Sequence, residues 1–208
     1  MITVWGGQTS RSLRVVWLME EMGLPYRVRH VDMLAAEKDA AWLAVNPGDF
    51  LPAIQDGDVT MVESIAILEY LMGRYGPTPL QPGPEDPAFP PYQQFLHMGE
   101  AGLATLIMVP LVSGFIAPEA ERDNWGARWA RGCVERRLML VRRRLAEAPY
   151  MAGDRFTAAD ISVSFALRLG ANHAGFALGD AEQAYLARTT SRDAYKRAFN
   201  RSHEGLPT

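Results

Sequence analysis

The first 75 residues alternate between short apolar runs and stretches with helical spacing. The β-branched and aromatic run at 2–5 and the alternating apolar and polar residues at 26–33 predict strands, because successive side chains of a strand face opposite sides of a sheet. Helical spacing predicts further elements at 10–22, 36–45 and 64–75. The first of these helices stops at Gly23, a typical helix-ending residue.

The stretch NPGDFLPAIQDGDVTMVES at residues 46–64 has the pattern of a hairpin that leads into a helix. Pro52 stands directly before an apolar run, at the one end of a strand where a missing backbone donor does little harm. Asp56-Gly57 between two such runs is a strong signal for a tight turn. The order strand, helix, strand, helix, strand, strand, helix therefore predicts a small mixed sheet with helices packed on it.

The pattern changes after a segment rich in proline and glycine at residues 76–92, which has the composition of a stiff linker. Beyond it, helical periodicity predicts helices at 92–117, 119–147, 157–173 and in shorter pieces near 180–200. The most apolar window, residues 102–117, contains Pro110 and is shorter than the roughly 20 residues that a membrane-spanning helix needs. We expect it to be a buried core helix.

One helix start can be predicted from four residues in GDRFTAADI. Thr157 is a suitable N-cap, and Asp160 three residues later can accept from the Thr157 amide, which makes a capping box. Phe156 and Ile161 occupy the positions of a hydrophobic staple. We expect these residues to be structural, with a loss of about 1 kcal/mol when a cap is removed.

Composition excludes several classes of protein. With 48% apolar and 22% charged residues among 208, the chain is globular rather than disordered. A net charge of −3 gives no footprint for nucleic acid, and no membrane partner is expected. The only cysteine, Cys133, cannot form an internal disulfide, which favours a reducing, cytoplasmic location. The histidines show no metal-ligand spacing, so no metal site is predicted.

Three segments, at residues 10–26, 46–71 and 153–161, together resemble the soluble glutathione transferase family. The resemblance implies an α/β thioredoxin-like N-terminal domain at 1–76, a linker at 77–91 and an all-α helical C-terminal domain at 92–208. It also implies a homodimer that uses glutathione as co-substrate. The implied reaction is conjugation of the glutathione thiolate to a small hydrophobic electrophile.

The reaction needs a thiolate, and the start of the first helix offers hydroxyl donors for it. A thiol titrates near pH 8.5, so lowering its pKa by about two units takes about 2.7 kcal/mol of preferential stabilisation of the anion. A hydroxyl together with the positive end of a helix can supply this. Ser10, followed by Arg11, Arg14 and Trp17, resembles the SRxxRxxW motif of certain bacterial and fungal members. Ser10 is the predicted catalytic residue, with Thr9 and Ser12 as alternatives.

The resemblance also assigns residues that hold glutathione. It implies a cis bond between Leu51 and Pro52, with the Leu51 backbone pairing with the cysteinyl unit as an added strand would. It implies that Glu63 and Ser64 bind the γ-glutamyl end, and the free amides at a helix N-terminus support this. Phe50 stands where many members have a lysine for the glycine carboxylate.

We expect Arg11 to compensate for that lysine. The acceptor pocket is expected between the domains, lined by residues that follow the linker: His97, Glu100, Ala101, Leu103, Ala104 and Met108. Two alternatives to conjugation stay open at the level of sequence. One is a ligand- or partner-binding protein with this fold and little catalysis, which Phe50 favours. The other is a glutathione-dependent reductase or dehalogenase.

Overall fold

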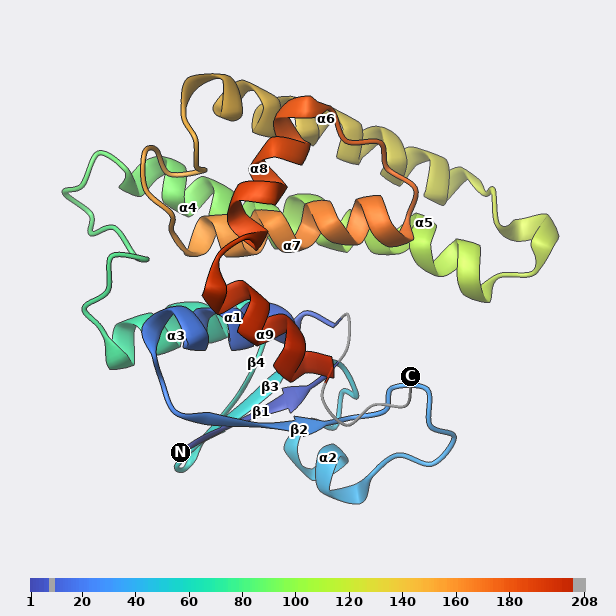
Figure 1. The fold of residues 1–208 in the computed structure, drawn as a ribbon. Helices are drawn as coiled ribbons and strands as arrows, with labels where there is room; N and C mark the ends of the chain where they lie inside the picture. The colour runs from blue at the N-terminus through green and yellow to red at the C-terminus, as the bar shows by residue number, and fades with distance from the viewer. Residues whose placement is uncertain (8–9, 204–208) are drawn as a thin grey trace. The chain divides into compact units, whose positions relative to one another are not determined.

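The computed structural model describes residues 1–7 and 10–203 and forms two compact units. The first unit is Met1–Thr78 together with the segment that begins at Ser191, and the second is Pro79–Thr190 (Figure 1). The predicted fold class, an α/β unit followed by a helical unit, is confirmed. The last helix, however, groups with the first unit, whereas the sequence pattern placed it in the helical domain.

The first unit is a four-stranded sheet in the order β2-β1-β3-β4. Helices α1 and α3 lie on one face of this sheet and α2 lies on the other (Figure 1). Strands β1 and β2 are parallel, whereas β1–β3 and β3–β4 are antiparallel. The elements are β1 (Ile2–Gly6), α1 (Ser12–Met22), β2 (Tyr26–His30), α2 (Ala40–Val45), β3 (Ala53–Asp56), β4 (Val59–Val62), α3 (Ser64–Tyr75) and α9 (Asp193–His203). The predicted order of these elements before α9 is confirmed.

The boundaries of the predicted elements shift where side chains cap a helix. The helix predicted from residue 36 begins at Ala40, because the Asp39 side chain accepts the Ala41 amide at 2.8 Å and caps the helix there. The predicted hairpin turn is confirmed, with Gly57 at a φ of 59°. A positive φ is the conformation that glycine adopts without steric cost.

Helix α9 belongs to the first unit because it packs on α1. The rings of Trp17 and Tyr195 meet edge to face with centroids 4.8 Å apart. The Arg192 guanidinium donates two hydrogen bonds to the Glu21 carboxylate, at 2.6 and 2.7 Å. A two-pronged arginine–carboxylate pair beside a buried aromatic contact fixes the helix more firmly than an isolated surface pair does.

The second unit is mostly helical. Its elements are α4 (Phe89–His97), the π-helix η1 (Met98–Ala104), α5 (Thr105–Ile116), the 3₁₀ turn η2 (Glu119–Glu121), α6 (Trp125–Glu147), α7 (Ala158–His173) and α8 (Asp180–Thr190). The first three run on as one helix, which begins with Pro90 and Pro91 in its first turn. At the π-helix, Gly99 lies so close to Ser162 on α7 that an added Cβ would meet the Ser162 Oγ at 2.3 Å.

Helix α5 corrects the expectation of a buried core helix at residues 102–117. Only Ile107 and Pro110 of α5 are buried, and Phe115 and Ile116 are 74% and 77% exposed. In the described part of the chain, one helix, Phe89–Ile116, is long and apolar enough to cross a membrane, with a mean hydropathy of 1.6 over an 18-residue stretch of it. Length and composition alone do not make it a membrane span. Apolar composition predicted burial here, but within the described residues about half of the side chains of α5 are exposed.

The predicted capping box at α7 is confirmed and is more extensive than expected. The Asp160 carboxylate accepts the amides of Thr157 and Met151, both at 2.8 Å. It also accepts the hydroxyls of Thr157 at 3.2 Å and of Tyr185 at 2.9 Å. Burial raises the pKa of Asp160 to about 6, against the opposing effect of these donors.

Candidate functional site

The strand register brings three separate segments to one end of the sheet. Trp5 on β1 pairs with Ala53 on β3, and Ala53 pairs with Val62 on β4. These residues form one row across the sheet. On the same side of this row the chain leaves β1 toward α1, enters β3, and leaves β4 toward α3. The predicted residues on the three segments therefore lie at the same end of the sheet, although the first segment is about 50 positions from the others in sequence.

The segment before β3 is held as a compact turn. The Leu51-Pro52 peptide bond is cis, as predicted. The buried side chain of Asn46 donates to the Phe50 carbonyl at 2.7 Å and accepts the Gly48 amide at 3.0 Å. The Phe50 ring is 41% exposed and lies against Gly48, where an added Cβ would meet it at 2.8 Å. Phe50 thus supplies an apolar surface and no charge.

The loop between β1 and α1 gathers two hydroxyls. The Oγ atoms of Ser10 and Ser12 lie 2.6 Å apart, and the Gly7 amide donates to the Ser12 Oγ at 3.0 Å. Ser10 is half-buried, whereas Ser12 is fully buried. Thr9, the third predicted hydroxyl, lies outside the described residues. Of the two described serines, Ser10 is therefore the one that a ligand can reach.

The start of α3 carries the predicted acid and hydroxyl in an unusual backbone conformation. Glu63 is exposed and has a φ of 71°, a left-handed conformation that costs a non-glycine residue energy and is often found at functional sites. Within the described part of the chain, α3 has no side-chain cap and no acidic residue in its first turn. Ser64 is buried at 2% exposure. The first-turn amides are thus left to face an anion.

Two cations near these segments have no predicted role. Arg14 is fully buried on α1, and its guanidinium donates to the Ser64 Oγ at 3.2 Å, so it joins the start of α1 to the start of α3. Lys38 lies beside the Phe50 turn, with its ammonium 3.6 Å from the Asp49 carboxylate. For Arg14, the sequence did carry a signal of burial, because this arginine stands within a run of apolar helix positions. Nothing in the sequence marks Lys38.

The expected acceptor residues separate into two groups. Leu103 and Ala104 are fully buried in the core of the second unit, so they do not line an open pocket there. This corrects the expectation for these two positions, because the π-helix η1 that carries them is packed against α7 and its other helical neighbours. His97 and Ala101 lie on the exposed side of the same helix.

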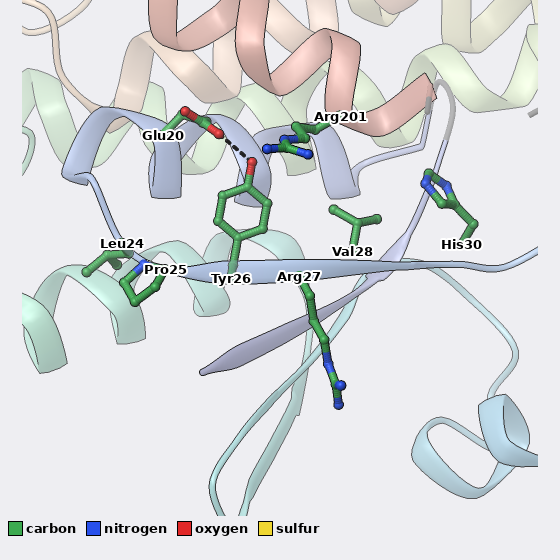
Figure 2. A pocket seen from close by; sticks show the side chains of 8 residues that line it. All are labelled: Glu20, Leu24, Pro25, Tyr26, Arg27, Val28, His30 and Arg201. Atoms are coloured by element: carbon green, nitrogen blue, oxygen red, sulfur yellow. Dashed lines mark hydrogen bonds between the residues drawn. The ribbon is translucent and has the colours of Figure 1, made fainter. Parts of the chain in front are cut away.

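A cavity of about 580 Å³ lies elsewhere in the first unit, along β2 (Figure 2). Tyr26 and Val28 point to one side of β2 and Arg27 to the other. The Tyr26 hydroxyl donates to Glu20 at 2.5 Å, and burial together with this bond raises the pKa of Tyr26. The lining residues are Glu20, Leu24, Pro25, Tyr26, Arg27, Val28, His30 and Arg201. No predicted site residue is among them, so this cavity is distinct from the site at the sheet end.

The site at the sheet end suits a ligand that carries two different anions. One end offers the Ser10 hydroxyl at the start of α1, where a sulfur anion would be stabilised by a hydrogen bond and the helix dipole. The other end offers open amides, the Ser64 hydroxyl and the buried charge of Arg14, which suit a carboxylate. Among the described residues, no group of three or more metal-ligand side chains was found.

Comparisons with known proteins agree with this geometry. A family described as "Glutathione S-transferase, N-terminal domain" matches residues 1–73. The chain is 30% identical over 177 residues to glutathione S-transferase 3 of Schizosaccharomyces pombe, covering 79% of this chain and 72% of that protein. It is 29% identical over 175 residues to glutathione S-transferase GstB of Escherichia coli K12, covering 79% and 80%.

Solved structures give the same picture. A ternary complex of BphK, a bacterial GST, has a TM-score of 0.83 at 26% identity, covering 98% of this chain and all of that one. A theta class glutathione S-transferase from Xanthomonas axonopodis pv. citri, with glutathione bound, has a TM-score of 0.79 at 27% identity, covering 95% and 96%.

Proposed function

Because the chain belongs to the glutathione S-transferase family, we propose that it binds glutathione at the sheet end and joins its thiolate to a hydrophobic electrophile. The observation that carries this proposal is the meeting of three segments there: the Ser10 loop, the cis Leu51-Pro52 turn and the start of α3. A structural neighbour with glutathione bound supports glutathione as the co-substrate.

We propose that the Ser10 hydroxyl donates a hydrogen bond to the glutathione thiolate. This makes the chain a serine-type member with the SRxxRxxW motif. The thiol loses its proton to solvent, and the resulting anion accepts a hydrogen bond from the Ser10 hydroxyl. The sulfur then forms a bond to the electrophilic carbon, and for an aryl chloride the chloride ion leaves. Ser12 is buried, which disfavours it as a direct donor, and Thr9 is the remaining alternative.

The proposed glutathione site uses both backbone and side chains. The backbone of Leu51 pairs with the cysteinyl unit, while the start of α3 holds the γ-glutamyl end through Ser64 and its free amides. Glu63 is exposed beside these groups, where its charge offsets the ligand's ammonium. Arg11 and Lys38 are the proposed cations for the glycine carboxylate, since Phe50 brings no charge.

We also propose that two copies of the chain form a homodimer. The exposed apolar side of α5, with Phe115 and Ile116 largely accessible, supports this, because extended apolar surfaces are usually covered in solution. The glutathione-binding domain is proposed to be residues 1–76, joined by the linker at 77–91 to the helical domain from residue 92. A cytoplasmic location is proposed from the free, buried Cys133.

The test is conjugation of chlorodinitrobenzene by the wild type and by Ser10→Ala, with glutathione binding followed by calorimetry. We expect the substitution to lower turnover by one to three orders of magnitude and to leave binding nearly intact, since it removes a bond made to the thiolate. Unchanged turnover would move the role to Thr9 or Ser12. Binding by the wild type without turnover would favour a ligand-binding protein, or a reductase or dehalogenase that substrate profiling would identify.

A further inference from the structure

A buried serine lies next to Ser10, whose hydroxyl we propose as the hydrogen-bond donor to the thiolate. Ser12 is 1% exposed, and its Oγ lies 2.6 Å from the Oγ of Ser10. The same oxygen accepts the Gly7 amide at 3.0 Å. The proposed function uses Ser10 alone and leaves this second hydroxyl unexplained.

Burial decides which of the two serines donates. A hydroxyl has one proton to donate and two lone pairs that accept. The Ser12 oxygen already accepts from Gly7, and among the described residues the Ser10 Oγ is the acceptor that its proton reaches. Buried hydroxyl protons are nearly always paired. If Ser10 donated instead, the Ser12 proton would have no acceptor among the residues that the structure describes. Ser12 is therefore the donor.

The consequence falls on Ser10. Its Oγ also accepts the backbone amide of Ser12 at 3.3 Å, so two donors from Ser12 occupy its lone pairs. The Ser10 proton cannot return to Ser12 and is left for a third partner. Ser10 is half-buried, so a ligand from solvent can be that partner. Hydrogen bonds in a chain polarise one another, and accepting two of them makes Ser10 a stronger donor.

We infer that Ser12 is a positioning residue that turns the Ser10 hydroxyl toward the sulfur of glutathione. The inference rests on the proposed function, because it needs Ser10 to be the thiolate donor. Both serines keep their protons throughout, and the thiol proton leaves to solvent. Close packing holds Ser12 in place, since a Cβ on Gly6 would lie 2.2 Å from the Ser12 Cβ.

The test is a double-mutant cycle with Ser10→Ala, Ser12→Ala and the two combined. The pKa of the thiol in the glutathione complex is measured by thiolate absorbance, and the pH profile of kcat/KM is measured with chlorodinitrobenzene. We expect Ser12→Ala to raise the thiol pKa by roughly half to one unit and to lower kcat/KM near neutral pH by about three- to tenfold. The glutathione KM should stay within about twofold, because the residue does not touch the ligand.

The cycle separates this inference from the proposed function. If Ser12 acts through Ser10, Ser12→Ala has no further effect in the Ser10→Ala background. Losses that multiply would show a merely structural role and overturn the inference. A normal thiol pKa in Ser12→Ala, with a raised one in Ser10→Ala, would overturn the inference and leave the proposed function standing. A normal thiol pKa in Ser10→Ala would overturn the inference together with the proposed role of Ser10.

A second variant covers the case in which Ser12→Ala does not fold. Ser12→Cys has a similar size, and buried cysteine is well tolerated, but its S–H is a weaker donor. We expect a thiol pKa between those of the wild type and Ser10→Ala. A value equal to the wild type would overturn the inference, because the strength of the buried donor would then not matter.

Discussion

The starts of α7 and α3 use similar residue types but leave their backbone amides in opposite states. At α7, Thr157 and Asp160 are fully buried, and the Asp160 carboxylate accepts bonds from within the same unit. At α3, Glu63 is exposed with a φ of 71°, and within the described chain no side chain caps the helix. At α7, an acid three positions after the N-cap accepts hydrogen bonds at the helix start. The first turn of α3 has no such acid, so its amides stay available to a ligand.

This difference separates a structural helix start from one that can bind a ligand. The amides at a helix start must find an acceptor. When the chain supplies the acceptor, the site is saturated and contributes to stability. When it does not, an anion from solvent takes that place. The buried charge of Arg14 beneath α3 adds to the attraction for such an anion.

Removing the carboxylate at the start of α7 should have the largest effect, and the effect should be on stability. Asp160→Asn replaces a carboxylate oxygen by an NH₂ group that faces the amide and hydroxyl of Thr157. We expect the free energy of unfolding to fall by about 2–4 kcal/mol, since buried donors lose their acceptor. Chemical denaturation measures it. Asp180→Asn, at an exposed position in the first turn of α8, is the matched control and should change stability by less than about 0.5 kcal/mol. Equal effects would contradict the comparison.

Removing the cation beside the start of α3 should affect glutathione binding more than folding. Arg14→Met removes the charge and the bond to Ser64, and we expect glutathione affinity to fall by about tenfold, because hydrogen bonds from charged groups are worth more than neutral ones. Calorimetry measures the affinity, and circular dichroism confirms the fold. Arg74→Met, in the last turn of α3, serves as the control and should bind normally. Unchanged affinity in Arg14→Met would show that the open amides act without it.

The smallest effect is expected at the glycine end of glutathione. Lys38→Met should weaken glutathione binding by about two- to threefold, because the lysine is already engaged by Asp49 and its remaining attraction is screened by solvent. The affinity of γ-glutamylcysteine, which lacks the glycine carboxylate, should not change. An equal loss for both ligands would place Lys38 in the folding of the loop rather than in recognition.

Features that depend on neighbours in sequence could be predicted, and those that depend on distant contacts could not. The α7 capping box, the Gly57 turn and the start of α3 at Ser64 are each encoded within a few residues. The hydrogen bond from Arg14 to Ser64 was not predictable, because the two residues lie 50 positions apart in sequence. Apolar composition also misled for α5, since it does not say whether the same chain provides the cover.

The packing of α9 on α1 has a consequence for synthesis of the protein. The Arg192–Glu21 pair spans 171 positions, so a ribosome must add 171 residues after Glu21 before this contact of the first unit can form. The second unit, Pro79–Thr190, is contiguous and emerges earlier in full. Because domains generally fold as units during translation, the nascent α/β unit lacks the contact between Trp17 and Tyr195 until α9 has been made.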